Sequence, residues 1–486
     1  MARETVSRHG LVTFGPVLVA VMAALLIGVP KASADPPLTQ ISSDPFTNVG
    51  SQHATEVEPD TFAFGNTVVA AFQTGRVFTG GSADIGFAVS HNGGRTWPVR
   101  GFLPSLTVNA TPPGPFAAAS DPSVAYDAAH RKWLISSLVI GPEGVGIATS
   151  ASSDDGDHWD APVAMPSSGF TNWDKNWIAC DNSTRSPFYG QCYTTWDDFG
   201  NINLLLSATS VDGGATWSPA MPTANHAIGI GGQPMVQPDG TVVVPVDDAF
   251  ESTVLAYRST DGGASWGPTV TVAPITTHFE AGGLRSSPLP SAGRDAAGNI
   301  YVVWQDCRFR PGCDANDLVL STSSDGVSWT DPQRIPIDPV TSAVDHFIPG
   351  LGVDPDTSGG RAHLALSYYF YPDTACTPES CELDVGFVTS ADGGATWSSP
   401  SRLNPSPISL AWLPSTTQGQ MVGDYMSTSF VNSGPIAVFA LASAPDATLH
   451  ESMYAAVLKV QHGASVANER PANRLTKART NRVIAR

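Results

Sequence analysis

Charged residues are scarce in this sequence, and basic residues are scarcer than acidic ones. Only 14% of the 486 residues are charged, and 25 Lys and Arg stand against 44 Asp and Glu, which gives a formal net charge of −19. Residues 1–34 contribute +2 and the residues after Asn468 contribute +5, so the rest of the chain carries about −26. A body this acidic repels nucleic acid and anionic membranes, and we expect neither as a partner.

Long apolar runs are also missing, and the longest falls short of the roughly 18 residues that a membrane-spanning helix needs. This run, VLVAVMAALLIGV, covers Val17–Val29, follows Arg3 and Arg8, and precedes the small-residue sequence KASA. The order is typical of a secretory signal peptide cleaved after Ala34, with an uncleaved anchor as the alternative. We therefore expect residues 1–34 to be a signal peptide and the mature protein to be secreted and extracellular, with no membrane span.

Cysteine is rare, and its six copies fall into three pairs that are close in sequence: Cys180 with Cys192, Cys307 with Cys313, and Cys376 with Cys381. Local disulfides of this kind suit an oxidising compartment. Zinc is the alternative ligand, but the sequence has no C-x-x-C motif and no histidine at ligand spacing beside these pairs. The sequence therefore predicts three disulfides.

Several catalytic motifs are absent from the sequence. It has no Ser–His–Asp order, no P-loop, no H-E-x-x-H, and no G-x-G-x-x-G followed by a βα unit. Its one G-x-S-x-G match, GASWG at 263–267, overlaps a turn motif that recurs along the chain. These absences argue against α/β-hydrolases, nucleotide-binding enzymes and zinc proteases of the usual types.

Glycine and proline, in contrast, are plentiful, with 46 and 40 copies, and they favour short strands joined by tight turns. One turn-like motif recurs six times, at intervals typical of a repeat that forms the blades of a propeller. The copies are SHNGGRTW (Ser90–Trp97), SSDDGDHW (Ser152–Trp159), SVDGGATW (Ser210–Trp217), STDGGASW (Ser259–Trp266), SSDGVSW (Ser323–Trp329) and SADGGATW (Ser390–Trp397). In each copy an Asp or Asn accepts backbone hydrogen bonds, a Gly supplies a positive φ, and the Trp covers apolar surface. The motif is therefore a structural hairpin turn.

This pattern, S-x-D-x-G-x-T-W, resembles the Asp box, or BNR repeat, of the sialidase-like β-propellers. The six copies span some 300 residues, so the resemblance implies an all-β fold of four-stranded antiparallel blades. It leaves the activity open, because the same turn occurs in sialidases, other glycoside hydrolases, lyases and non-catalytic propellers.

A second repeat indicates the number of blades. Seven strand openings, each followed by an apolar second strand, begin at Glu58, Asp121, Asp174, Gln233, Ser287, Ile348 and Gly423. The last unit has no box and lacks a fourth strand, which Pro37–Ser42 can supply and so close the ring without exposed edges. We predict a monomeric, single seven-bladed propeller over residues 35–462, with six blades as the alternative, followed by a basic, disordered tail over 463–486.

The boxes lie between third and fourth strands, so the loops between sheets and the loops after second strands are expected on the opposite face. Acids, arginines and aromatic residues gather in those loops, which suits a hydroxyl-rich ligand such as a glycan. The candidate substrate-binding residues are Glu58, Arg76, Asp84, Asp121, Lys175, Gln233, Arg285, Arg308 and Asp424. The candidate catalytic residues are Asp174, Asp198, Glu280, Asp306 and Tyr425.

Glycoside hydrolysis usually needs two carboxyl groups, and crowded acids push their pKa values apart. The resemblance implies a Tyr nucleophile with a Glu, an Asp and three Arg, which Tyr425, Glu280, Asp84, Arg76, Arg285 and Arg308 would provide. The sialidase F/Y-R-I-P opening is missing, however, because the first inner strand begins EPDTF. The single R-I-P, Arg334–Pro336, follows the fifth box on an outer strand, so the sialidase set does not carry over residue by residue.

These observations predict a secreted, glycan-active enzyme, a glycoside hydrolase that works through acids at the channel mouth. A non-catalytic propeller that binds glycan or protein is the alternative, and a purely structural propeller is a third reading. We expect no cofactor, with structural Ca²⁺ at acid pairs such as Asp197–Asp198 and Asp247–Asp248 as the alternative.

Overall fold

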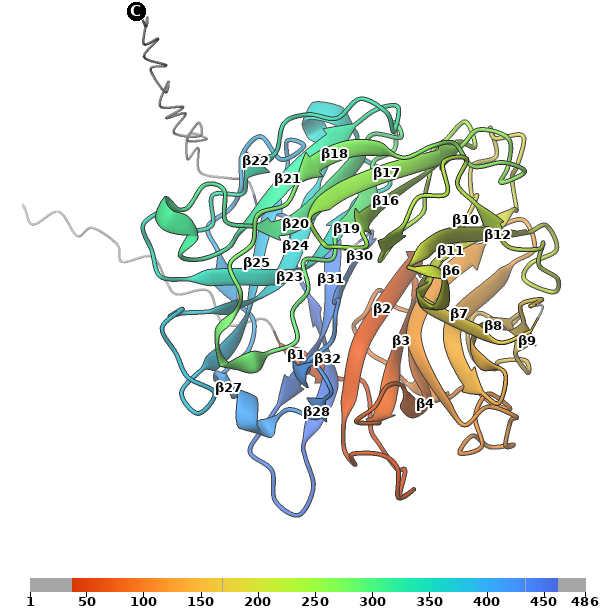
Figure 1. The fold of residues 1–486 in the computed structure, drawn as a ribbon, viewed down its shortest axis with the longest axis horizontal. Coiled ribbons are helices and arrows are strands. Elements are labelled where there is room, and N and C mark those ends of the chain that lie inside the picture. Colours follow the sequence, from red (N-terminus) through yellow and green to blue (C-terminus); the bar gives the residue numbers. More distant parts are fainter. Residues whose placement is uncertain (1–36, 168, 433, 462–486) are drawn as a thin grey trace, which may run out of the picture. The chain divides into compact units, whose positions relative to one another are not determined.

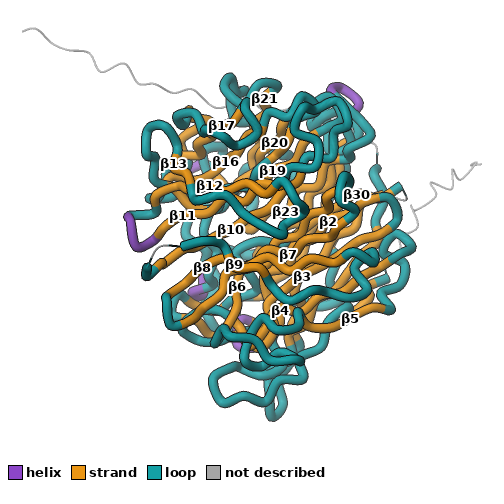
Figure 2. Tube along the Cα trace, turned by 90° about the vertical axis from the view of Figure 1, so that its right-hand side faces the viewer, coloured by secondary structure: helices purple, strands orange, loops and turns teal. Residues whose placement is uncertain are grey.

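The computed structural model describes residues 37–461 except positions 168 and 433. The predicted signal peptide and the basic tail lie outside this range. Within it the chain forms thirty-two strands and five short 3₁₀ segments, and Figure 2 shows how little helix accompanies the strands. The 3₁₀ segments are η1 (Phe199–Asn201), η2 (Ala281–Gly283), η3 (Pro311–Cys313), η4 (Gly359–Arg361) and η5 (Leu410–Trp412). No helix in this described part has the length and apolar character needed to cross a bilayer.

The first three groups of strands are antiparallel and follow chain order. The first contains β2 (Glu56–Phe64), β3 (Thr67–Arg76), β4 (Ser82–Ser90) and β5 (Val99–Phe102). The second contains β6 (Ala118–Asp127), β7 (Lys132–Gly141), β8 (Gly144–Ser152) and β9 (Val163–Ala164). The third contains β10 (Thr171–Cys180), β11 (Cys192–Asp198), β12 (Leu204–Ser210) and β13 (Met221–Pro222). Short pairings of β4 with β6 and of β8 with β10 join the three groups into one sheet.

The next three groups repeat this order. The fourth begins with a strand broken into β14 (Gly229–Ile230) and β15 (Met235–Val236), followed by β16 (Val242–Asp248), β17 (Thr253–Ser259) and β18 (Val270–Pro274). The fifth contains β19 (Ser291–Arg294), β20 (Ile300–Asp306), β21 (Asp317–Ser323) and β22 (Gln333–Arg334). The sixth contains β23 (Asp345–Val353), β24 (Leu364–Tyr371), β25 (Glu382–Ser390) and β26 (Ser401–Arg402), with β27 (Ile408–Ser409) also paired to β25. A separate hairpin joins β28 (Ser415–Thr416) to β29 (Gly419–Gln420).

The last group combines strands from both ends of the described chain. It contains β30 (Ser427–Val431), β31 (Gly434–Ala442) and β32 (Glu451–Val457), and β1 (Leu38–Gln40) pairs antiparallel with β32. Figure 1 shows β1 beside β32. The fourth strand of this sheet therefore comes from the N-terminal segment, as the sequence predicts.

The first strands of the seven groups contact one another in succession. β2 contacts β6, β6 contacts β10, and the contacts continue through β15, β19, β23 and β30 back to β2. A backbone N–H on one first strand often donates to a side chain of the preceding one, as Val124 N does to Asp60 (2.8 Å) and Leu351 N to Ser291 (2.9 Å). Thr61 N donates to Ser427 (3.0 Å) and so ties the first group to the last.

The six repeated turns all lie between a third and a fourth strand, where the sequence places them. In the turn after β4, Gly94 N donates to Ser90 Oγ at 2.9 Å, and Trp97 Nε1 donates to Gly94 O at 3.1 Å. Gly94 has a φ of 76°, and a Cβ added there would lie 2.7 Å from Ile436 Cδ1 of the neighbouring sheet. Only glycine satisfies both the turn and this close approach. The Trp side chain is buried in five copies and half-buried in the shortened fifth copy.

The three predicted disulfides are present in the structure. Cys180 ends β10 and Cys192 begins β11, so this bond closes the connection between two neighbouring strands. The other two bonds close loops that follow the second strands β20 and β24. They brace loops on the side that carries the candidate residues.

Two glutamates are buried where the last sheet meets the first. Glu56 begins β2 and Glu451 begins β32, and both side chains are fully buried. Ser42 Oγ donates to Glu56 Oε2 at 2.7 Å, whereas Glu56 Oε1 and both Glu451 oxygens have no hydrogen-bond partner among the described residues. Burial raises the pKa of Glu56 to about 7. Burial, with Glu56 nearby, raises the pKa of Glu451 well above its usual range.

Glu451→Gln is expected to stabilise the protein by about 1–3 kcal/mol at pH 8, because it removes a buried, unpartnered carboxylate. The folded carboxyl groups keep their protons to higher pH than unfolded ones do. The free energy of unfolding of the wild type should therefore fall as pH rises from the unfolded pKa, about 4.5, through about 7. Urea unfolding of both proteins at pH 5 and pH 8 measures this effect. A wild-type stability that does not change over this range, or a variant less stable than wild type at pH 8, would contradict it.

Candidate functional site

A group of charged side chains lies where the first strands begin, and we call it the central cluster. It consists of Glu58 on β2, Asp121 on β6, Asp174 and Lys175 on β10, Arg285 after η2, and Asp424 before β30. Three of these residues owe their position to an irregularity of the local backbone. Glu58, Asp121 and Lys175 sit at register shifts of their strands with φ of 54°, 43° and 50°. Such bulges redirect side chains, and non-glycine residues with positive φ are uncommon enough to mark a functional candidate.

Lys175 is the hub of the cluster. Its Nζ lies 3.5 Å from Glu58 Oε1 and 3.5 Å from Asp121 Oδ2, and it donates to Asp424 Oδ2. Arg285 binds Asp424 from the other side, with Nε donating to Oδ1 at 2.6 Å. The Lys175 side chain is only 7% exposed, so these opposite charges interact with little screening by water.

The acids of the cluster titrate in different ranges. Burial raises the pKa of Glu58 well above its usual range, although Lys175 opposes the shift. Burial also acts to raise the pKa of Asp121, but Lys175, a hydrogen bond with Glu58 and Arg285 together outweigh it and hold that pKa below its usual value. Burial, with the Asp121 charge nearby, raises the pKa of Asp174 to about 6. Carboxyl groups whose environments push their pKa values apart are typical of acid–base sites.

Tyr425 and Arg76 lie beside the cluster. Lys175 Nζ lies 5.8 Å from the centre of the Tyr425 ring, which packs edge-on against Trp177 with 5.0 Å between ring centres. Burial raises the pKa of the Tyr425 hydroxyl well above its usual range, so this hydroxyl keeps its proton at neutral pH. Arg76 interacts electrostatically with Glu58, and its Nη1 donates to Val77 O at 2.8 Å.

A pocket of about 20 Å³ adjoins Lys175, Trp177, Gln233 and Tyr425, which is room for about one water molecule. Gln233 also joins two sheets, because its Oε1 accepts from Ala292 N at 2.8 Å. The structure thus brings nine of the fourteen predicted residues to one place: Glu58, Arg76, Asp121, Asp174, Lys175, Gln233, Arg285, Asp424 and Tyr425.

The other five predicted residues lie outside the central cluster, and most of them are bound by side chains close by. Asp306 binds Arg308 at 2.9 and 2.6 Å, which braces the loop after β20. Glu280 accepts from Ser286 Oγ at 2.7 Å and from the amides of Gln305 and Asn316, each at 2.8 Å. Burial raises the pKa values of Glu280 and of Asp84 on β4 to about 8. Asp198 ends β11 next to η1, at the edge of the cluster.

Three exposed apolar side chains lie in loops near Asp198, and the sequence did not predict them as part of the site. Phe170, Phe199 and Ile202 are 79%, 62% and 72% exposed, and their loops adjoin, since a Cβ on Gly200 would lie 3.3 Å from Asn172 Cβ. Asp174, the partly exposed acid of the cluster, stands on β10 directly after the first of these loops. The available signal was a large apolar residue within each of the polar, glycine-containing stretches GFTN and DFGNIN.

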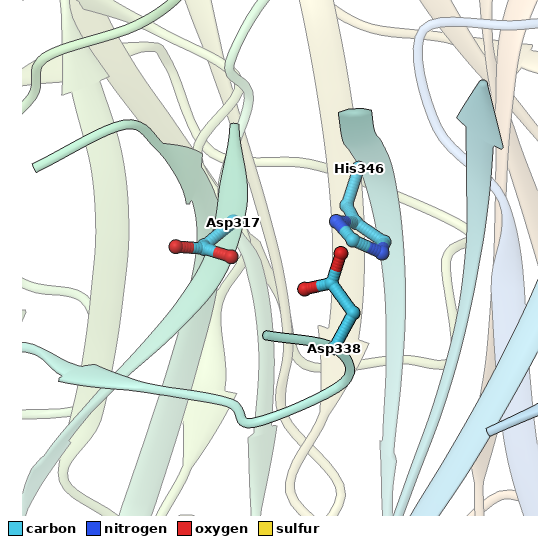
Figure 3. Close-up of side chains that lie close together, drawn as sticks. All are labelled: Asp317, Asp338 and His346. Atoms are coloured by element: carbon cyan, nitrogen blue, oxygen red, sulfur yellow. The ribbon is translucent and has the colours of Figure 1, made fainter. Parts of the chain in front are cut away.

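One group of three potential metal ligands occurs among the described residues: Asp317, Asp338 and His346, whose ligand atoms lie within 4.8 Å of one another (Figure 3). Two arginines already bind its carboxylates. Arg310 Nη2 lies 2.7 Å from both Asp317 and Asp338, and Arg334 reaches them at 2.9 and 2.7 Å. Two guanidinium charges disfavour a divalent cation here, so the group is an ion-pair network. Arg334, the arginine of the R-I-P sequence, is thus a structural residue on β22.

Comparisons with known proteins give no family. No protein-family model matches the sequence, and no curated protein matches it. Among solved structures, a Hadza microbial sialidase is 16% identical over 84% of this chain and 68% of its own, with a TM-score of 0.43. An ulvan lyase of polysaccharide lyase family PL25 is 10% identical over 88% of this chain and 97% of its own, at 0.46. A mutant of the NanB sialidase from Streptococcus pneumoniae is 13% identical over 88% and 71%, at 0.41. Scores and identities this low assign no activity to the chain.

Proposed function

We propose that this chain is a secreted, closed seven-bladed β-propeller whose repeated turns are Asp boxes. The unbroken succession of contacts among the seven first strands supports the ring, and the Thr61–Ser427 hydrogen bond supports its closure. The three disulfides and the signal-like N-terminal sequence support secretion.

The proposed activity is glycoside hydrolysis at the central cluster, and one observation carries it. Asp174 and Asp121 lie in the same cluster with pKa values shifted in opposite directions. Asp174, with a pKa of about 6 and partial exposure, donates a proton to the leaving glycosidic oxygen. Asp121, kept ionised by Lys175, acts as the base or stabilises the developing positive charge.

The apolar side chains beside Asp174 provide the sugar contacts in this proposal. Phe170 and Phe199 present their rings to solvent next to the most accessible acid of the cluster. Sugar rings pack their C–H faces against such aromatic surfaces. Substrate thus approaches from the side of β10 and η1, whereas Glu58 and Asp424 are buried and pair with Lys175.

A panel of aryl glycosides that includes a sialoside tests the activity, with the secreted chain beginning at Asp35. We expect release of the aryl group from at least one substrate, with a rate that falls as pH rises through about 6, where Asp174 loses its proton. Asp331→Asn changes an exposed acid outside the cluster and is expected to behave like the wild type. If every substrate stays intact across pH 4–8, hydrolysis at this cluster is wrong.

Glycan binding without turnover is the second candidate function, and the burial of the cluster favours it. Glu58, Asp121 and Asp424 are at most 4% exposed, and Lys175 and Arg285 already pair with them. In this case a glycan array should show binding that Phe199→Ala weakens and Asp174→Asn leaves unchanged. Binding of this kind with no product from any glycoside would favour this function over hydrolysis.

A further inference from the structure

A larger cavity lies along the same first strands, beyond the central cluster. Its volume is about 210 Å³, and residues of the first strands of all seven groups line it. On β2 it begins at Asp60, two residues after Glu58, and on β6 at Val124, three residues after Asp121. Trp177 and Gln233 line both this cavity and the small pocket beside Lys175. The cavity therefore adjoins the small pocket and extends from it towards the side of the repeated turns.

The walls of this cavity offer hydrogen-bond acceptors. Along the cavity, each first strand pairs with its second strand only. The backbone groups on its other edge therefore take no part in the hydrogen bonding of a sheet. Several N–H groups of these edges already donate to side chains of the adjacent strand, as Val124, Ile178 and Ala292 do. The edges therefore present mainly carbonyl oxygens, which accept hydrogen bonds from hydroxyl groups.

Arg294 supplies the cavity with a positive charge that has no close acid. It ends β19, lines the cavity and is only partly buried. Its Nη1 donates to Asp295 O at 3.2 Å, and no carboxylate of residues 37–461, as far as they are described, lies within 4 Å of its guanidinium. Asp181 and Asp295 act on it only from a longer range. In contrast, Arg285 and Arg310 are each bound directly by an aspartate.

We propose that this cavity binds a small hydroxylated carboxylate, with Arg294 holding the carboxylate and the strand edges accepting from the hydroxyls. The planar guanidinium fork matches a carboxylate through two hydrogen bonds. The cavity has the space of about seven water molecules, which admits one sugar ring. Arg294 is the one cationic side chain among the described lining residues, and the acidic Asp60 also lines the cavity. The net positive charge is therefore small, which favours a monoanion over a phosphate dianion. The site does not depend on hydrolysis at the central cluster.

Isothermal titration calorimetry with D-glucuronate tests this proposal, with D-glucose as the neutral probe. We expect one molecule of D-glucuronate to bind per chain, at least about 10-fold more tightly than D-glucose, because charge-assisted hydrogen bonds to Arg294 are lost with glucose. Arg294→Met should weaken D-glucuronate binding by about 10-fold or more. Arg258→Met is the matched control, since Arg258 is also partly buried, does not line the cavity, and donates to Asp325 O at 2.7 Å.

Two further variants keep the result interpretable. Arg294→Lys retains the positive charge but not the planar guanidinium, so it should bind D-glucuronate with intermediate affinity. This variant tests the role of Arg294 if Arg294→Met does not fold. Asp174→Asn should bind D-glucuronate like the wild type, whatever its activity. The proposal is overturned if D-glucuronate does not bind at concentrations on the order of 10 mM. Equal affinity in folded Arg294→Met, or a loss of binding in Asp174→Asn, overturns it as well.

Discussion

Asp174→Asn is expected to lower kcat/KM by about 10²–10⁴-fold for an aryl glycoside that the wild type hydrolyses. This is the usual contribution of a general acid. The amide has nearly the same shape as the carboxyl group and cannot donate a titrating proton to the leaving oxygen. Because the pKa of Asp174 is about 6, the variant should also lose the fall in rate that the wild type shows as pH rises through that value.

Initial rates between pH 4 and 8, measured for the wild type, Asp174→Asn and Asp331→Asn, check this expectation. The Asp331 variant controls for the loss of one exposed negative charge outside the cluster. If Asp174→Asn keeps its rate within about two-fold and its pH profile, Asp174 is not the proton donor. A glycoside with a good leaving group should be less affected, because its departure needs less protonation.

Lys175→Met is expected to destabilise the protein by about 3–5 kcal/mol at pH 7, the usual effect of removing one partner from a buried ion pair. Glu58, Asp121 and Asp424 would then face one another, with Arg285 bound to Asp424 and Arg76 acting on them from a longer range. In the variant these carboxyl groups should keep their protons to higher pH than in the unfolded chain. The deficit should therefore be smallest near pH 4 and grow as pH rises towards 7.

Urea unfolding at pH 4 and pH 7 measures this deficit, with Lys459→Met, which changes an exposed lysine, as the control. The double variant Lys175→Met with Asp121→Asn should recover part of the lost stability, since it removes one of the uncompensated charges. A Lys175→Met protein as stable as the wild type at pH 7 would show that the ion pairs around Lys175 contribute nothing net.

The two predictions separate structure from catalysis within one cluster. Lys175 pairs with Asp121 and helps to lower its pKa, so its replacement is expected to change both stability and the proposed activity. Asp174 is partly exposed and lies at the edge of the cluster, so its replacement should change activity alone. Normal stability and unchanged glycan binding in Asp174→Asn, in a protein without any turnover, would instead favour the binding function.

The sequence by itself determined the elements whose causes are local. The six turns lie where their seven or eight residues predict, because each is closed by hydrogen bonds within the motif, such as Gly94 N to Ser90 Oγ. The three disulfides join cysteines at most 12 residues apart. Seven openings, each followed by an apolar segment, marked the first and second strands, and the missing fourth strand of the last group indicated the role of β1.

Only the tertiary structure decided which acids meet and which are already held by a partner. Glu58 and Asp424 are 366 residues apart and become neighbours through the contact of β2 with β30. Asp306 and Glu280 were equally plausible in the sequence, yet Arg308 binds the first and a network of Ser286, Gln305 and Asn316 binds the second. The exposure of Phe170 and the place of Arg294 in the cavity wall likewise became visible only in three dimensions. The physical reason is that burial and ion pairing depend on distances between groups far apart in the chain, whereas turns and strand periods depend on sequence neighbours.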